Sequence, residues 1–476
     1  MRKEILFLFC AALLLLPAAC NDSKTPPPPV QSAPEVVAES YEMVPLHMEG
    51  GLLRDPAGRI FILHGVNYSQ ELKRPPFFDW QAVEHFEDLA SWGFNVIRYL
   101  INWDSIEPER GYYDVAAIDE IEEGVQFALE NNIYVLLDMH QDIYSPIFNG
   151  NGMPEWTALD DPNVPNTVNS GDWYMNYANM DVCHSFDNFY TDEELQLGYA
   201  NAWIKVIERI KKYPNVIGYD LINEPWIGTC APWDFEETRL LPFYNKLTER
   251  IRKVDPDRPI FLEPSPFNVN QGLPSLMPLP DDPNVVFTPH YYDPLMVLEK
   301  PYDNGKWRVE EGLGFTKDKA IEWGTGAFLG EFGANLNQEG SHDYLQDIVD
   351  VAEALHFSGW TYWNYYPLPF GGWHNHNIVD KNGDPHPILD RIVRPRPAGL
   401  LGTLVSQKYD VTTGTYLLEW TGGVGLNQIL VPTWIYPVGI QVEIEDATWN
   451  YDPQSQILEI NVLRENGAAH RLKITP

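Results

Sequence analysis

The chain has 476 residues, 44% of them hydrophobic, which is enough for one large domain with a substantial core and a smaller second domain. Its 68 acidic residues outnumber 32 basic ones, giving a formal net charge of -36. Such a chain offers no basic face to phosphates, which excludes nucleic acid as a partner and disfavours purely electrostatic attachment to anionic lipid.

The first 45 residues predict a targeting segment and a tether. A basic start, an apolar run and small residues before Cys20 are typical of a signal peptide over residues 1–20. Cys20 stands where a bacterial lipoprotein carries its lipidated cysteine, but Pro17 departs from the usual leucine, so lipidation and simple cleavage both stay open. The proline-rich residues 21–45 predict an extended tether. We therefore expect an exported protein, either secreted or held at the cell surface as a lipoprotein.

Residues 46–395 predict an α/β fold, a (β/α)8 TIM barrel, because apolar strand patterns alternate with helical ones. The eight predicted strands are 59–67, 95–100, 133–139, 216–222, 259–262, 285–289, 327–330 and 359–363. The predicted helices are 80–92, 118–131, 194–212, 242–254, 317–323 and 344–355. A long connection over 141–192 is expected to roof the substrate site, and segments 264–282 and 292–314 are expected to add to its rim.

Residues 398–476 alternate short β-type runs with turns, which predicts a C-terminal antiparallel β-sandwich domain. Its predicted strands are 416–420, 428–432, 439–444, 457–462 and 470–474. This part of the sequence has no evident nucleophile or metal cluster, so its expected role is packing against the barrel.

Two cysteines follow Cys20 in the sequence, Cys183 and Cys230. In an exported protein they are candidates for one disulfide, which is the favoured interpretation. The alternative is two free thiols.

Two glutamates after predicted strands carry the strongest functional signal. Glu224 lies in an Asn-Glu-Pro motif after the fourth strand, and Glu331 lies in a Gly-Glu-Phe-Gly motif after the seventh. Catalytic residues of a barrel gather at the C-terminal ends of its strands. A facing pair of carboxylates there is what retaining glycoside hydrolysis requires. The alternative is two ordinary carboxylates that cap helices.

The sequence around these glutamates resembles a known family. The barrel resembles glycoside hydrolase family 5, a group of retaining (β/α)8 glycosidases. Longer strings resemble the endoglycoceramidases, which release intact glycans from glycosphingolipids and leave ceramide. These strings are LDMHQDIYS (137–145), SFDNF (185–189), VNQGLPS (269–275) and PHYY (289–292). The resemblance runs from about residue 50 to the C-terminus and includes the β-domain.

The resemblance implies a role for each strand-end residue. Glu224 is expected to be the acid/base and Glu331 the nucleophile, while Asn223 binds the sugar 2-hydroxyl. Arg98 is expected to hold Glu331 ionised through a charge-assisted pair. His140 is expected to bind sugar hydroxyls, with Asp138 as its buried hydrogen-bond partner.

Four further residues are expected to complete the site. His290 and Tyr292 steer the nucleophile by hydrogen bonding, and Trp363 forms a platform beneath the sugar. Lys73 either touches the first sugar or the polar part of ceramide, or is a solvated lysine. Asp138, His140 and Asp142 are also conceivable as a metal cluster, but sugar contacts explain them better.

Aromatic residues near the predicted site either line a lipid groove or pack the loops. They are Trp173, Tyr174, Phe186, Phe189, Tyr365, Tyr366 and Phe370.

The expected activity is that of an endoglycoceramidase, which hydrolyses the β-glycosidic linkage between oligosaccharide and ceramide by a retaining mechanism that needs no cofactor or metal. The expected partner is a glycosphingolipid presented by a membrane surface or micelle. A monomer is expected, although the sequence leaves the oligomeric state open. Alternatives are a glucosylceramidase, a β-1,4-endoglucanase and, from another class, a non-catalytic carbohydrate- or lipid-binding surface protein.

Overall fold

The computed structural model describes residues 43–68, 73–78, 80–161, 173–366, 375–380, 382–464 and 469–476. The predicted signal peptide, Cys20 and nearly all of the predicted tether lie outside these residues. Within the described ranges, no helix combines the length and the apolar character that crossing a membrane would need.

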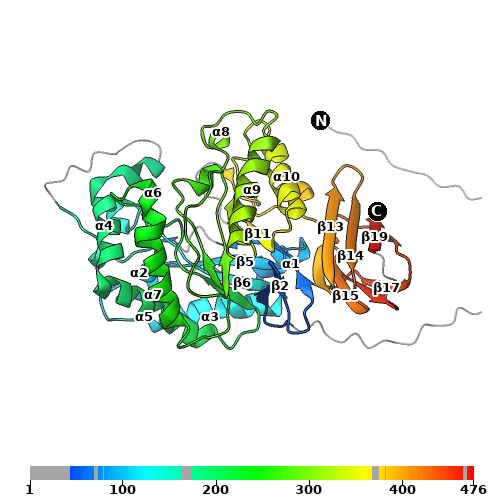
Figure 1. Ribbon diagram of the computed structural model, residues 1–476, viewed down its shortest axis with the longest axis horizontal. Coiled ribbons are helices and arrows are strands. Elements are labelled where there is room, and N and C mark those ends of the chain that lie inside the picture. The colour runs from blue at the N-terminus through cyan, green and yellow to red at the C-terminus, as the bar shows by residue number, and fades with distance from the viewer. Residues whose placement is uncertain are drawn as a thin grey trace, which may run out of the picture. The chain divides into compact units, whose positions relative to one another are not determined.

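The predicted (β/α)8 barrel is confirmed: eight parallel strands form one sheet in the order β10-β11-β4-β5-β6-β7-β8-β9. Helices lie around these strands, of which β5, β6 and β11 are labelled in Figure 1. These strands are β4 (Leu63–Tyr68), β5 (Val96–Ile101), β6 (Tyr134–Met139), β7 (Val216–Asp220), β8 (Ile260–Leu262), β9 (Val285–Phe287), β10 (Phe328–Phe332) and β11 (Gly359–Tyr365). Parallel bridges from Phe287 to Ala327 and from His290 to Glu331 join the two end strands, so the barrel is nearly closed. The strands are almost entirely buried, as expected for a parallel sheet covered on both faces.

Helices surround the barrel; two of the long ones differ from the prediction, and four short ones were not predicted. The helices are α1 (Val83–Ser91), α2 (Trp103–Ile106), α3 (Val115–Glu130), α4 (Met180–Thr191), α5 (Glu193–Ile210), α6 (Pro232–Phe235), α7 (Leu241–Ile251), α8 (Pro294–Val297), α9 (Lys306–Glu322), α10 (Ser341–Ala354) and α11 (Leu389–Ile392). Helix α4 lies in the connection that was predicted as a loop, because the apolar residues Val182, Phe186 and Phe189 recur at helical spacing and face the core. Helix α9 begins well before residue 317, in a segment whose glycines obscure its periodicity.

The C-terminal domain contains two antiparallel sheets, which confirms its predicted class. Its strands are β12 (Arg396–Leu400), β13 (Thr403–Asp410), β14 (Thr415–Thr421), β15 (Gly425–Leu430), β16 (Gln441–Glu443), β17 (Ala447–Asp452), β18 (Ile457–Val462) and β19 (His470–Thr475). One sheet has the order β13-β14-β19-β16, and the other has the order β1-β2-β3-β12-β15-β18-β17.

Three short strands from the start of the described chain belong to this second sheet: β1 (His47–Glu49), β2 (Leu52–Arg54) and β3 (Ile60–Phe61). The prediction of one strand over residues 59–67 is therefore wrong, because β3 pairs with β12 while β4 enters the barrel. The range predicted for the barrel, 46–395, thus includes three strands of a sheet that otherwise belongs to the C-terminal domain, which they join through the pairing of β3 with β12.

Candidate active site

Arg98 is the centre of the predicted site. It projects from β5, is completely buried, and uses all five of its N–H groups. The acceptors are Asp220 Oδ2 at 2.8 Å, Asn67 Oδ1 at 3.0 Å, Glu331 Oε1 at 2.7 Å, Asn223 Oδ1 at 3.0 Å and Glu263 Oε1 at 2.7 Å. Asp138 Oδ1 lies 3.0 Å from Nη2. Burial alone would lower the pKa of Arg98, but Asp138, Asp220, Glu263 and Glu331 raise it well above its usual value.

Glu331, in β10, has a donor on each carboxylate oxygen. Arg98 Nη1 donates to Oε1 at 2.7 Å, and the hydroxyl of Tyr292 donates to Oε2 at 3.0 Å. The pair that the sequence predicted between Arg98 and Glu331 is thus present. A carboxylate held in this way is fixed in orientation and paired with a permanent cation.

Glu224, just after β7, has a different environment. Its Oε1 accepts a hydrogen bond from Asn270 Nδ2 at 2.6 Å and lies 3.0 Å from His290 Nδ1. Its backbone has a φ of +43°, a conformation that non-glycine residues rarely adopt. Glu263 Oε2 accepts from the backbone amide of Glu224 at 2.8 Å, and Gln141 Nε2 donates to its carbonyl oxygen at 3.0 Å. These two contacts hold the backbone in the strained conformation.

Helix α5 positions the end of β7. The hydroxyl of Tyr199 and the indole N–H of Trp203 both donate to the carbonyl oxygen of Leu221, at 2.7 and 3.1 Å. Asn223 then donates through Nδ2 to the carbonyl oxygen of Gln141 at 3.0 Å. The Asn-Glu pair is therefore anchored from the helix and from the neighbouring strand end.

His290 lies among three carboxylates. Its Nδ1 is 3.0 Å from Glu224 Oε1 and 3.5 Å from Glu331 Oε2, and its Nε2 is 3.2 Å from Glu263 Oε1. Burial would lower the pKa of His290, but Glu263, Glu331 and a hydrogen bond to Glu224 raise it well above its usual value. His290 lies between the two glutamates predicted to be catalytic: one carboxylate oxygen of each and one nitrogen of His290 all lie within 4.8 Å of one another.

Two groups in the described chain have spacing that a metal ion could use: Glu224 with His290 and Glu331, and Asp138 with Asp220 and Glu263. In each group, a cationic side chain of the protein already contacts the carboxylates. His290 with its raised pKa belongs to the first group, and the guanidinium of Arg98 contacts all three carboxylates of the second. The arrangement is explained by ion pairing.

His140 and Lys73 belong to a second cluster of charged side chains, which adjoins the cluster around Arg98 through Asp138. His140 Nδ1 lies 2.7 Å from Asp138 Oδ2, and Lys73 Nζ lies 2.6 Å from Asp142 Oδ2. Lys73 Nζ also lies 4.3 Å from the ring centroid of Trp363, and the ring of His140 stacks on the same indole at 5.7 Å. The Lys73 side chain is only 12% exposed, so it is not a solvated lysine here. Burial would raise the pKa of Asp142, but Lys73 and His140 lower it far below its usual value.

Sequence reasoning missed three residues of the site: Glu263, Asp220 and Asn270. Glu263 directly follows β8, so the rule that selected Glu224, a carboxylate immediately after an apolar strand, would have found it as well. Asp220 is the last residue of β7, so a search for carboxylates at the ends of apolar strands would have found it too. Asn270 lies in a short 3-10 helix, Val269–Gln271, and does not directly follow a strand, so this rule does not find it; its only signal is its place in the string 269–275 that resembles the endoglycoceramidases.

One prediction near the site is wrong. The disulfide is absent: Cys183 points inward from α4 and donates to the carbonyl oxygen of Tyr177 at 3.3 Å, while Cys230 Sγ lies 4.0 Å from Thr238 Oγ1. Of the two interpretations left open for the aromatic residues, packing is the one found for those whose side chains are described, because they are buried. These are Phe186, Phe189, Tyr365 and Tyr366. The side chains of Trp173, Tyr174 and Phe370 lie outside the described part of the structure.

The barrel, with paired glutamates beside a buried arginine at its strand ends, defines the protein as a (β/α)8 glycoside hydrolase. The family described as Cellulase (glycosyl hydrolase family 5) matches residues 59–368, and the glycoside hydrolase family 5 C-terminal domain matches residues 394–474. The chain therefore belongs to glycoside hydrolase family 5.

Its relatives include endoglycoceramidases. It is 26% identical over 456 residues to Endoglycoceramidase I of Rhodococcus hoagii, covering 87% of this chain and 85% of that protein. It is 26% identical to the Endoglycoceramidase of Cyanea nozakii, covering 79% and 81% of the two chains. The structure of Endo-glycoceramidase II from a Rhodococcus species in complex with ganglioside GM3 matches with a TM-score of 0.81 at 27% identity, covering 90% of this chain and 100% of that one.

Proposed function

We propose that this protein is an endoglycoceramidase that hydrolyses the β-linkage between oligosaccharide and ceramide with retention of configuration. The observation that carries the chemistry is the close approach of Glu224 and Glu331, which have carboxylate oxygens within 4.8 Å of each other. Retaining glycosidases hold their two carboxyl groups about 5–5.5 Å apart, whereas inverting enzymes leave about 6.5–9.5 Å for a water molecule.

The environments of the two glutamates support their different roles. Glu331 is paired with Arg98 and accepts from Tyr292, which suits an ionised nucleophile aimed at the sugar carbon. Glu224 has no arginine partner among the described residues and is more exposed, with 16% of its side chain accessible against 6% for Glu331. This environment suits a group that exchanges a proton with substrate and water.

In the first step, Glu224 gives its proton to the glycosidic oxygen while Glu331 attacks the anomeric carbon. The bond between sugar and ceramide breaks, ceramide leaves as a neutral alcohol, and the glycan is covalently attached to Glu331. In the second step, Glu224 removes a proton from water, whose oxygen attacks the same carbon and displaces Glu331. Glu224 ends protonated and Glu331 ends ionised, so the site is restored.

The substrate class rests on the relatives. Proteins named endoglycoceramidases match most of this chain, whereas a Glucosylceramidase of Aspergillus fumigatus matches at 35% identity over only 24% of it. Lys73 and Trp363 lie together beside His140, where they are available to contact a sugar ring. An aromatic face next to charged hydrogen-bond donors is a suitable surface for a sugar.

Mass spectrometry of the products tests the substrate class. The mature protein would be incubated separately with ganglioside GM3, glucosylceramide and a cellulose oligosaccharide. We expect intact oligosaccharide plus ceramide from the ganglioside. Free glucose from glucosylceramide alone would make the protein a glucosylceramidase, and cleavage of the cellulose oligosaccharide alone would make it an endoglucanase.

Two variants test the catalytic assignment. Glu331→Gln is expected to abolish turnover and leave glycolipid binding largely intact, because the side chain keeps its shape but loses its nucleophilicity. Glu339→Gln, an exposed residue on the following loop, is the matched control and should retain full activity. Turnover that persists in Glu331→Gln would refute the nucleophile assignment.

We also propose that the protein is an exported monomer that acts on substrate presented by a membrane or micelle. The predicted signal peptide supports export, and Cys20 supports attachment as a lipoprotein. Cell fractionation of the full chain and of Cys20→Ser tests this. Anchoring through Cys20 predicts that the variant moves from the membrane fraction to the soluble fraction.

A further inference from the structure

The segment that follows β8 contacts Glu224 through Asn270. The Nδ2 of Asn270 donates to Glu224 Oε1 at 2.6 Å, and its carbonyl oxygen accepts from the backbone amide of Tyr292 at 2.7 Å. Asn270 lies in the short 3-10 helix Val269–Gln271, and the rest of residues 264–282 contains no helix or strand. Regular secondary structure therefore does not fix the position of Asn270, and this position depends on contacts from outside the segment.

Glu236 holds this segment on both sides of Asn270. Its Oε1 accepts from the backbone amide of Ser265 at 2.8 Å, and its Oε2 accepts from the backbone amide of Leu276. The hydroxyl of Ser275 lies 3.1 Å from each of the two carboxylate oxygens. One carboxylate thus joins the chain that precedes Asn270 to the chain that follows it.

The chemistry of Glu236 suits this role. It is a buried residue at the start of the π-helical turn Glu236–Leu240, between α6 and α7, and such turns are frequent at functional sites. Burial raises the pKa of Glu236 above its usual value, against the opposing effect of the amides of Ser265 and Leu276 and the hydroxyl of Ser275. An ionised carboxylate only accepts hydrogen bonds, so it can bind both amides at once. A glutamine side chain can bind only one of them, because its NH2 group is a donor.

The chain beside Tyr292 has a separate anchor. Asp293 directly follows Tyr292, and its Oδ2 accepts from Arg308 Nε, in α9, at 2.6 Å. The hydrogen bond from Tyr292 to Glu331 is thus supported from α9. A shift of the segment after β8 should therefore disturb Glu224 more than Glu331.

We propose that Glu236 is a positioning residue for the acid/base: by holding residues 265–276 at both ends, it keeps Asn270 in hydrogen-bond contact with Glu224. The inference rests on the proposed glycoside hydrolysis, in which Glu224 protonates the departing oxygen. A displaced Glu224 carboxyl transfers its proton more slowly, because the transfer requires hydrogen-bond distance to that oxygen. The attack of Glu331 is affected less. The loss of rate should therefore depend on how strongly the leaving group needs a proton.

Two soluble substrates with the same sugar, phenyl β-lactoside and dinitrophenyl β-lactoside, separate proton donation from nucleophilic attack. Dinitrophenolate is stable as an anion and leaves without a proton, whereas the phenyl group leaves readily only with acid assistance. General acid–base catalysis contributes about 10²–10⁴-fold to such reactions. Glu236→Gln in the full chain should lower kcat/KM about tenfold more for the phenyl lactoside than for the dinitrophenyl lactoside. Equal losses on the two substrates would show a merely structural role and would overturn the proposal.

Two further variants test the path from Glu236 to Glu224. In the Asn270→Ala background, Glu236→Gln should change the ratio of the two kcat/KM values by less than about twofold, because both changes break the same series of contacts. A full, multiplicative effect in that background would overturn the path through Asn270. Ser275→Ala removes one donor and keeps the carboxylate, which preserves the test if Glu236→Gln disturbs folding. It should shift the ratio about threefold, and an unchanged ratio would overturn the proposal.

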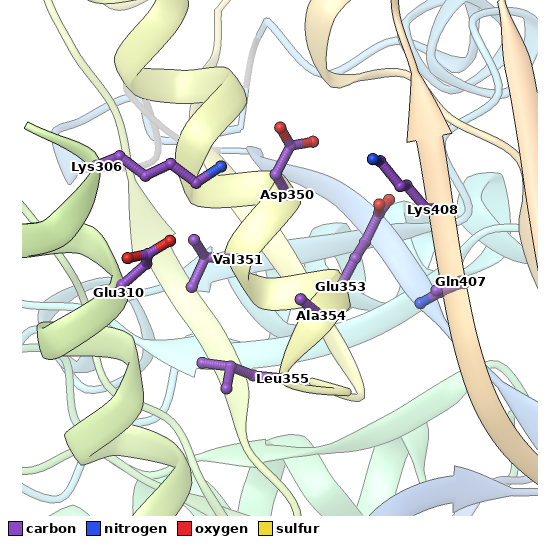
Figure 2. Close-up of a pocket in the computed structure, with 9 residues that line it drawn as sticks. All are labelled: Lys306, Glu310, Asp350, Val351, Glu353, Ala354, Leu355, Gln407 and Lys408. Atoms are coloured by element: carbon purple, nitrogen blue, oxygen red, sulfur yellow. The ribbon is translucent and has the colours of Figure 1, made fainter. Parts of the chain in front are cut away.

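Glu353→Gln is the matched control. Glu353 is also a buried carboxylate on a helix, but it lines a depression between α9, α10 and β13 that none of the predicted site residues lines (Figure 2). Its replacement should leave the ratio unchanged, and a shift equal to that of Glu236→Gln would refute the positioning role. A natural protein that cleaves neither lactoside would contradict the proposed function itself. Cleavage of both, with an unchanged ratio in Glu236→Gln, would refute only the role of Glu236.

Discussion

At the scale of single residues, the charge of Arg98 stabilises the four buried carboxylates at the centre of the barrel. The variant Arg98→Met would leave Asp138, Asp220, Glu263 and Glu331 facing one another without their shared cation. Removing one partner of a buried ion pair costs about 3–5 kcal/mol. We expect at least this loss in the free energy of unfolding, measured by urea denaturation.

An exposed arginine provides the comparison for that measurement. Arg110 pairs with Glu194 at 3.0 Å, but their side chains are 62% and 78% exposed. Exposed pairs contribute about 0–1 kcal/mol, so Arg110→Met should change the free energy of unfolding very little. Equal losses in the two variants would contradict the role given to Arg98.

Glu263 is the positioning residue that links the two glutamates predicted to be catalytic. It accepts from Arg98 and from the backbone amide of Glu224, and it lies 3.2 Å from His290 Nε2. Its charge helps to raise the pKa of His290, so Glu263→Gln lowers that pKa and His290 loses its proton at a lower pH. We expect kcat to fall about tenfold and the alkaline limb of the pH profile of kcat/KM to move to lower pH.

A purely structural role for Glu263 would give a different result. Glu263→Gln would then lower the melting temperature while the alkaline limb of the pH profile stayed in place. An unchanged profile would therefore refute the coupling between Glu263 and His290.

At the scale of elements, the barrel depends on how closely neighbouring strands approach. A Cβ atom on Gly65, in β4, would overlap the backbone carbonyl of Val96 in β5, and a backbone atom cannot move aside as a flexible side chain can. Gly65→Ala should therefore destabilise the protein by about 3 kcal/mol or more, measured as the free energy of unfolding.

A glycine-to-alanine substitution in helix α9 provides the comparison, because there the added methyl group has free space. A Cβ atom on Gly314 meets nothing within 4 Å. Because alanine is favoured over glycine in a helix interior, Gly314→Ala should stabilise the protein by about 0.5–1 kcal/mol. Equal effects at Gly65 and Gly314 would refute the argument from strand spacing.

An element can be predicted from the sequence when the pattern that identifies it lies within its own residues. Most residues of the eight barrel strands are apolar, and Glu224 and Glu331 were visible because each directly follows a predicted strand. Strands β1–β3 were missed as a unit because their partner β12 lies more than three hundred residues later, and no local pattern reveals such pairing. The contact of Asn270 with Glu224 was missed for the same reason, because 46 residues separate them in the sequence. The orientation of Cys183 into the core is a tertiary property that residue type does not contain.

At the scale of the whole molecule, Glu353 makes stability depend on pH at the junction of the two domains. Burial raises its pKa from 4.5 to about 7, with Arg394 opposing and Asp350 reinforcing the shift. The folded protein thus binds this proton more tightly than the unfolded chain. The resulting stabilisation, about 3 kcal/mol, is complete below pH 4.5 and is lost as the pH rises through about 7.

Glu353→Gln removes this dependence. The free energy of unfolding of the variant minus that of the natural protein should rise by about 3 kcal/mol between pH 4.5 and pH 8, because only the natural protein must bury a charge. Paired urea titrations across this range provide the measurement. A difference that does not vary with pH would show that Glu353 titrates normally in the folded protein.

One sheet contains strands from both the start and the end of the described chain. We therefore predict that the barrel does not fold without the C-terminal domain. Ending the chain at residue 395 removes the strand opposite Ile60 and Phe61 and uncovers Leu52, Ile60 and Ile62. It also removes Arg396, which donates to the buried Asn95 Oδ1 at 2.9 Å. Residues 43–395 alone should therefore aggregate or lose cooperative thermal unfolding, whereas residues 43–476 should unfold in a cooperative transition. Size-exclusion chromatography and thermal melting distinguish these outcomes, and a monomeric 43–395 fragment with an unchanged melting temperature would show that the barrel is independent of its partner domain.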